Sequence, residues 1–253
     1  MTDNPYASPS PENNPAPLKT QWKFGLFHLL SIVVIGGLGI ALLIPAPTRS
    51  RVAARRTQCK NNIKQIGLAL HNYHDHYGTF PPAYTVDSNG KRLHSWRTLL
   101  LPYLDQGELY KKIDLSKAWD DPVNAEAAKT ELYAYHCPSA PGPNTHTSYM
   151  VPIGAHTCFP GATSKSIPEI TDGTGNSVMV VEVEAEKSVP WMSPTDVDEQ
   201  FLLSLGPKSK VSHAGGLNTL LADGSVRFLS FNLDQKVRRA LMTIDAGDIV
   251  GDF

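Results

Sequence analysis

Apolar residues recur at alternating spacings of four and three in the segment that follows Arg49. The positions are Cys59, Ile63, Ile66, Leu70, Tyr73 and Tyr77. This period places them on one stripe of an α-helix, and Gly78 with the Pro81–Pro82 pair predicts that the helix ends near Tyr77. We therefore expect a long N-terminal helix that packs one face on a folded domain.

A second hydrophobic segment has no period, because almost every position in it is apolar. Gly25–Ile44 contains no Asp, Glu, Lys or Arg. About twenty helical residues cover about 30 Å, which is the thickness of the hydrocarbon core of a bilayer. The sequence predicts a transmembrane helix over 23–45. Before it, 1–22 are rich in Pro, Asn and Ser and predict a disordered cytoplasmic tail, and 46–253 form the main domain.

The second half of the chain alternates strand-like runs with turns. The runs are Ser177–Ala185, Leu217–Ala222 and Ser225–Phe231, and two short helices are expected earlier, within His94–Pro122. Asp223-Gly224 separates the last two runs and predicts a two-residue hairpin of type I′. Its register places Thr219, Leu221, Val226 and Phe228 on one face, toward the long helix. The order of the elements, with helices in the first half and strands in the second, predicts an α+β fold with an antiparallel sheet.

Composition narrows the class of protein. The chain has 253 residues, of which 41% are hydrophobic and 19% charged, with a formal net charge of -1. These values exclude wholesale disorder, and the lack of basic excess excludes nucleic acid as a partner. With three cysteines no complete disulfide framework is defined; Cys137 and Cys158 are a possible pair in an oxidising compartment, while Cys59 is interpreted as a small buried apolar residue.

Candidate metal ligands lie near the end of the long helix. His71, His74 and Asp75 share part of one helix surface, and imidazole with carboxylate at this spacing can bind zinc. No second cluster supplies the remaining ligands, so histidines that stabilise a helix C-terminus are the alternative.

Other carboxylates also have two interpretations. The segment Ile170–Ser177 has the oxygen ligands of a calcium loop but not the acidic alternation of an EF-hand, which favours a tight turn. Glu182, Glu184 and Glu186 are expected on the solvent face of a strand, with glycosidase carboxylates as the alternative. Hydrolase, phosphate-binding, zinc-protease and dinucleotide motifs are absent, so the sequence predicts no enzyme and no cofactor.

Several stretches together resemble a known family. TQCKNNIKQIGLALHNY, YHCPS, ITDGTGNSVMVVE and HAGGLNTLLADGSVRFLS occur in the order found in bacterial prepilin-like proteins named for a terminal H-X9-DG signature. The resemblance implies a type IV pilin-like helix, embedded in the membrane in its first half, and an extracytoplasmic domain. At the position of the family's assembly glutamate this chain has Leu30, so a permanently anchored relative is expected rather than a processed, polymerising subunit.

Topology is predicted differently by two criteria. Arg49, Arg51, Arg55, Arg56 and Lys60 follow the apolar segment, and the positive-inside count would place the main domain in the cytoplasm. The resemblance implies the opposite, because the family's members carry the same basic stretch and expose the domain outside, and we follow it.

Two functions follow from these patterns. The first is a membrane-anchored, pilin-like structural or accessory protein of the cell envelope or secretion apparatus, whose partners are the membrane and other pilin-like subunits or envelope proteins. The second is an extracytoplasmic module that binds a solute, glycan or metal.

The residues expected to interact are His213, Asp223 and Gly224. A strand from Leu217 to Asp223 covers about 20 Å, so His213 is expected to contact something outside its own hairpin, with Asp223 as a turn residue.

Overall fold

The computed structural model describes 25–43, 48–206, 208–248 and 250. It divides into two compact units, Met1–Pro47 and Thr48–Phe253. The tail predicted over 1–22 lies outside the described residues, as do parts of the membrane segment predicted over 23–45. Each unit is described by itself.

The first unit contains one described helix, α1 (Leu26–Leu43). Among 27–37, where side-chain exposure is described, the large side chains are exposed; Phe27 is 87% exposed and Ile35 is 71% exposed. Among the residues with described placement, we find no helix that is both long enough and apolar enough to span a bilayer.

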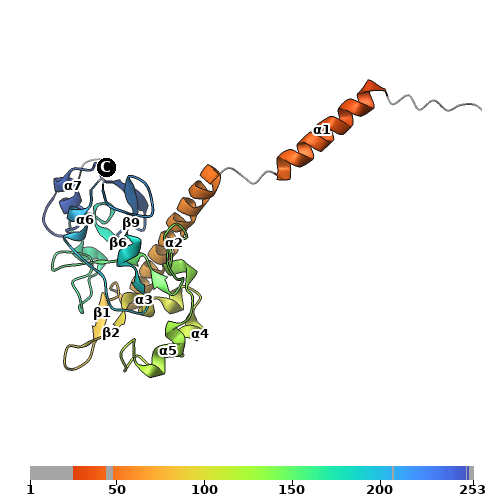
Figure 1. Ribbon diagram of the computed structural model, residues 1–253. Helices are drawn as coiled ribbons and strands as arrows, with labels where there is room; N and C mark the ends of the chain where they lie inside the picture. The colour runs from red at the N-terminus through yellow and green to blue at the C-terminus, as the bar shows by residue number, and fades with distance from the viewer. Residues whose placement is uncertain (1–24, 44–47, 207, 249, 251–253) are drawn as a thin grey trace, which may run out of the picture. The chain divides into compact units, whose positions relative to one another are not determined.

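The second unit begins with α2 (Thr48–Tyr77), which confirms the predicted long helix and its end (Figure 1). Cys59, Ile63, Ile66 and Leu70 of the predicted stripe are fully buried. Residues 50–58 are exposed, so the domain covers the helix only from Cys59 onward.

The other elements of this unit are short. The α-helices are α3 (Trp96–Leu99), α4 (Gly107–Tyr110), α5 (Ala125–Ala128), α6 (Phe201–Ser204) and α7 (Gln235–Ala240). The 3-10 helices are η1 (Leu101–Tyr103), η2 (Pro122–Asn124), η3 (Tyr133–Tyr135), η4 (Ile167–Glu169), η5 (Thr174–Asn176) and η6 (Ala185–Lys187). The strands are β1 (Tyr84–Val86), β2 (Arg92–Ser95), β3 (His146–Thr147), β4 (Tyr149–Met150), β5 (Pro152–Ile153), β6 (Val178–Glu182), β7 (Val189–Pro190), β8 (Val197–Asp198), β9 (Gly216–Leu221) and β10 (Val226–Ser230).

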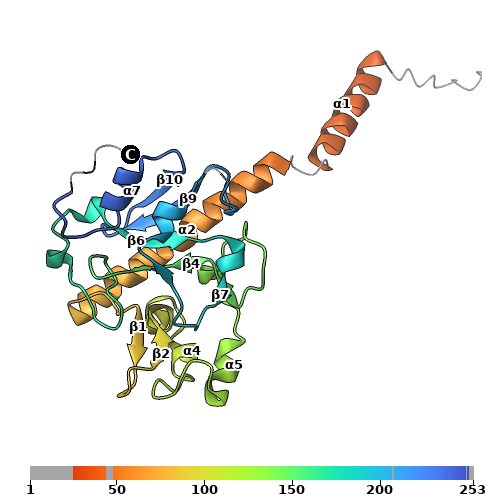
Figure 2. The same cartoon turned by 60° about the vertical axis from the view of Figure 1, so that its left-hand side comes forward.

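An antiparallel sheet in the order β10-β9-β6-β4 forms the centre of the domain. Side chains on one face pack with α2, and those on the other pack with α6 and the segment after α7. Figure 2 shows the sheet lying across α2, with β1, β2, α4 and α5 at one end of the domain and α7 at the other. Small pairs surround the sheet: β1–β2 and β3–β7 are antiparallel, and β5–β8 is parallel. The α+β class with antiparallel strands is confirmed.

The register predicted for the β9–β10 hairpin is wrong by one residue. Val226 pairs with Leu220 and Phe228 with Asn218. A two-residue type I′ turn needs positive φ at both central residues, but only Gly224 of the Asp-Gly pair has it, at 81°. The loop therefore has three residues, closed by the hydrogen bond from Leu221 N to Ser225 O at 2.9 Å.

This shift changes which side chains face α2. Leu220 and Val226 belong to the core that contains the α2 stripe, whereas Leu217 and Leu221 belong to the core on the opposite face. Phe228 also lies beside α2, with the Arg56 guanidinium 4.0 Å from its ring centre. Because strand side chains alternate between faces, a shift of one residue on one strand exchanges its two faces.

Candidate functional site

Four side chains from distant parts of the sequence meet between α2 and the central sheet. Cys59 comes from α2, Glu182 ends β6, Cys137 follows η3 and His213 precedes β9. Their sulfur, nitrogen and oxygen atoms all lie within 4.8 Å of one another, and all four residues are buried. Within the described part of the chain, this is the one group of three or more cysteine, histidine, aspartate or glutamate side chains arranged to hold a metal ion.

The imidazole of His213 is at the centre of this cluster. Its Nε2 atom lies 3.3 Å from Oε1 of Glu182 and 3.7 Å from Sγ of Cys137. The first separation is an ion-pair distance, but its direction is not that of a hydrogen bond, since Oε1 has no hydrogen-bond partner among the described residues. The other carboxylate oxygen, Oε2, accepts a hydrogen bond from Asn218 Nδ2 at 3.1 Å. The arrangement therefore leaves one buried carboxylate oxygen of Glu182, Oε1, within the cluster and without a hydrogen bond from the described residues.

The walls of the cluster are polar and internally bonded. Tyr149, opposite Glu182 in the β4–β6 pair, donates its hydroxyl to the carbonyl of Cys59 at 3.3 Å. Burial raises the pKa of Tyr149 well above its usual value, and the charge of Glu182 raises it further. Asn62, one turn after Cys59, donates to the carbonyls of Tyr133 and His136. These bonds position Cys59 and Cys137 from both sides.

The disulfide is not the Cys137–Cys158 pair that the sequence left possible. Cys59 is bonded to Cys137, across 78 positions in sequence, and Cys158 is a free, buried thiol. Burial raises the pKa of Cys158 to about 12, which keeps it protonated and unreactive at neutral pH. Cys59 is buried as expected, but it is not a simple apolar residue. The helical stripe could not show this, because it does not reveal which loop packs against the helix at Cys59.

His213 and Asp223 have different neighbours. Asp223 Oδ1 accepts a hydrogen bond from Ser225 N at 2.8 Å within the turn, and Asp223 N donates to Thr174 O. Gly224 lies beside α2, where a Cβ atom added to it would be 3.5 Å from the ring of His71. The structure thus brings the Asp-Gly turn to His71, and His213 to Cys137 and Glu182.

The three residues proposed as metal ligands on α2 are not brought together as a site. His71 Nε2 is buried with no hydrogen-bond partner among the described residues, while His74 Nε2 accepts from Ile167 N at 3.3 Å. Both rings pack against Phe80, and Asp75 is exposed. Their Cβ positions share a helix surface, but tertiary packing directs each ring to a separate neighbour.

Two predictions about acidic residues have opposite outcomes. The segment Ile170–Ser177 contains the turn η5, and Asp172 accepts hydrogen bonds from the backbone N–H groups of Ala246 and Gly247. The solvent-facing position predicted for Glu182 is wrong, because Glu182 is fully buried. The run of valines on both sides of it is a signal that was available. A strand apolar on both faces is covered on both faces, and a carboxylate within it is buried too.

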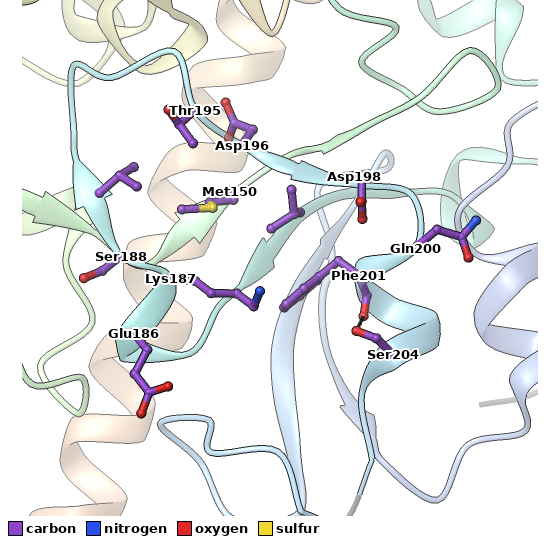
Figure 3. Close-up of a pocket in the computed structure, with 12 residues that line it drawn as sticks. Met150, Glu186, Lys187, Ser188, Thr195, Asp196, Asp198, Gln200, Phe201 and Ser204 are labelled. Atoms are coloured by element: carbon purple, nitrogen blue, oxygen red, sulfur yellow. Dashed lines mark hydrogen bonds between the residues drawn. The ribbon is translucent and has the colours of Figure 1, made fainter.

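An open pocket of ≈ 540 Å³ lies on another part of the domain. Met150, Val189 and Phe201 contribute apolar surface, and Glu186, Lys187 and Asp198 contribute charge. In Figure 3, Lys187 extends toward Phe201, and its Nζ atom is 5.9 Å from the ring centre. A pocket of this composition can accept a polar solute, since it combines apolar contact with both signs of charge.

Comparison with known proteins gives one match. Residues 48–168 match a family model whose description is "Protein of unknown function (DUF1559)". The match covers α2, Cys59 and Cys137, and it ends before Glu182, His213 and Asp223. No curated protein and no solved structure matches the chain. The likeness to DUF1559 therefore extends over the first part of the domain.

Proposed function

We propose that this protein is a membrane-anchored, non-enzymatic, pilin-like structural or accessory subunit of the cell envelope or secretion apparatus. The observation that carries the proposal is the division of α2 at Cys59. Residues 50–58 are exposed along one continuous helix, whereas from Cys59 onward one face of that helix is buried in the core it shares with the antiparallel sheet. A helix segment that its own domain leaves uncovered offers a surface on which neighbouring helices can pack.

The disulfide supports an extracytoplasmic position for the domain. Structural disulfides form and persist in oxidising compartments and are rare in the cytoplasm. The Cys59–Cys137 bond ties α2 to the segment after η3. It favours the orientation implied by the family resemblance over the orientation implied by the positive-charge count.

The orientation is tested by labelling in intact cells with a membrane-impermeant maleimide. Lys111→Cys introduces an exposed thiol on the domain, and Ser8→Cys introduces one in the N-terminal tail. We expect labelling of the Lys111→Cys chain in intact cells, and of the Ser8→Cys chain only after permeabilisation. The reverse pattern would place the domain in the cytoplasm and overturn this part of the proposal.

Assembly is tested by cross-linking in the membrane. Val52 is 62% exposed near the start of α2, and Val123 is 55% exposed within the domain. We expect a short bis-maleimide to link copies of the Val52→Cys chain, or this chain to a partner. The Val123→Cys chain, with similar exposure, is the control and should remain monomeric. A monomer from both variants would contradict a role that depends on helix packing.

A binding module is the second candidate, favoured by the pocket beside Phe201. Thermal-shift measurements with a panel of sugars and charged solutes test it. A shift produced by one compound in the wild-type protein and lost in Lys187→Ala would favour this candidate; no shift with any compound would remove it.

A further inference from the structure

We propose that Cys59, Cys137, Glu182 and His213 form a redox-controlled metal site, which is closed by the disulfide and binds a zinc-type divalent ion once that bond is reduced. The proposal is independent of the envelope role above. It rests on the donor atoms, their spacing and their burial.

The spacing of the donor atoms matches a tetrahedral zinc centre. Zinc binds sulfur at about 2.3 Å and nitrogen or oxygen at about 2.0–2.1 Å, which gives tetrahedron edges of about 3.6 Å from sulfur to nitrogen and about 3.3 Å from nitrogen to oxygen. The observed separations are 3.7 Å from Cys137 Sγ to His213 Nε2 and 3.3 Å from that nitrogen to Glu182 Oε1. Two thiolates, one imidazole and one carboxylate make four ligands, the number that a tetrahedral zinc site takes, and each is a donor type that zinc binds in proteins.

A buried carboxylate oxygen that accepts no hydrogen bond among the described residues marks the place of the ion. Oε1 of Glu182 is buried and has no hydrogen-bond partner among the described residues. A buried polar atom without a hydrogen-bond partner is unfavourable, so a carboxylate in this position gains from a cation. Asn218 binds Oε2 and orients the carboxylate, as outer partners of metal ligands do.

The same geometry disfavours a catalytic triad. In a nucleophile–histidine–carboxylate relay, the nucleophile and the carboxylate contact different nitrogens of the ring. Here Sγ of Cys137 and Oε1 of Glu182 approach the same atom, Nε2. Both side chains and the ring are also buried, which leaves no access for a substrate. Convergence on one point is the geometry of ligands around an ion.

The redox step balances with a dithiol as reductant. The dithiol transfers two electrons and two protons, becomes a disulfide, and leaves two thiols on Cys59 and Cys137. Metal binding then releases both thiol protons, because the thiolate is the ligand. The two Sγ atoms separate to about 3.8 Å in the tetrahedral site. Oxidation reverses both steps and expels the ion.

Cobalt titration of the full-length protein in detergent tests the proposal. The protein is reduced with a phosphine under anaerobic conditions, and Co²⁺ is then added to reduced and to oxidised samples. We expect one equivalent of Co²⁺ per reduced chain, with thiolate-to-cobalt charge transfer and the visible bands of a tetrahedral ion. Zn²⁺ should displace it. The oxidised protein should show neither the charge-transfer absorption nor the visible cobalt bands.

Matched variants locate the site. His213→Gln and Glu182→Gln should weaken Co²⁺ binding to the reduced chain by at least about tenfold, the lower end of the effect of losing even an outer-shell partner. His71→Gln changes a half-buried imidazole outside the cluster and should bind Co²⁺ as the wild type does. Circular dichroism of the oxidised variants reports whether they fold.

Three results would overturn the proposal and leave only a structural disulfide. They are no tetrahedral cobalt spectrum from the reduced wild-type protein, equal binding by the oxidised protein, and wild-type binding by both ligand variants. If neither ligand variant folds, the comparison between reduced and oxidised wild-type protein decides alone.

Discussion

The Nε2 atom of His213 lies 3.3 Å from Oε1 of Glu182, where the end of β6 meets the segment that leads into β9. Both side chains are buried against the Cys59–Cys137 disulfide, so a carboxylate, an imidazole ring and a covalent cross-link occupy one small volume between α2 and the sheet. The contact joins the segment before β9 to the end of β6, beside the disulfide that ties α2 to the segment after η3.

Counting thiols tests the cysteine arrangement. Under non-reducing conditions, the native protein should react with no more than a trace of maleimide, because a thiol with a pKa of about 12 is thiolate in only about one chain in ten thousand at pH 8. The unfolded, unreduced protein should label once, at Cys158, and the reduced protein three times. Peptide mapping should recover a linked pair that contains Cys59 and Cys137. Labelling at Cys59 in the unfolded, unreduced protein would contradict the assignment.

Gly67 tests the approach of α2 to the sheet. A Cβ atom at this position would lie 2.7 Å from Cδ1 of Leu220, which is fully buried. Gly67→Ala should therefore lower the free energy of unfolding by about 1–2 kcal/mol, because overpacking exceeds the gain of about 1 kcal/mol in helix propensity. Urea unfolding measures the change. Leu68→Ala, at the exposed neighbouring position, is the control, and a stabilising Gly67→Ala would argue against this packing.

The buried pair Arg97–Asp196 tests the other end of the domain. Its atoms are 2.8 Å apart with both side chains fully buried, and Arg97 also donates to the carbonyls of Tyr149 and Trp191. Asp196→Asn leaves a buried guanidinium without its counter-charge and should cost about 3–5 kcal/mol. The exposed pair Glu108–Lys111 supplies the control, since Glu108→Gln should leave the urea midpoint unchanged. Equal effects of the two substitutions would be inconsistent with the observed burial.

His94 predicts how stability depends on pH. Burial lowers the pKa of this imidazole below 6.5, while its Nε2 bonds to the Lys117 carbonyl. The unfolded chain then binds the proton more tightly than the folded chain. The contribution of neutral His94 is complete above the unfolded pKa and is lost as the pH falls below it. Urea midpoints at pH 7.5 and pH 5.5 should therefore fall further for the wild type than for His94→Gln. Parallel changes would contradict the assigned burial.

Local patterns were sufficient for the individual elements. The stripe from Cys59 to Tyr77 predicted α2 and its end, because helical period and the Gly-Pro stop signals act within a few residues. Strand-like runs bounded by turns predicted β6, β9 and β10 in the same way. The hairpin register was missed because the choice between a two-residue and a three-residue loop depends on the φ of Asp223, and Asp-Gly permits both.

By itself the sequence determined the period, length and order of the main elements, and from these the α+β class. Only the tertiary structure decided that Cys59 bonds to Cys137, that Glu182 is interior, and that His213 joins them while Asp223 stays in its turn. The physical reason is that periodicity reports the face on which a residue lies. Which residues pack against that face depends on contacts between helix and sheet residues that are far apart in the sequence. A short stretch of sequence does not contain this information.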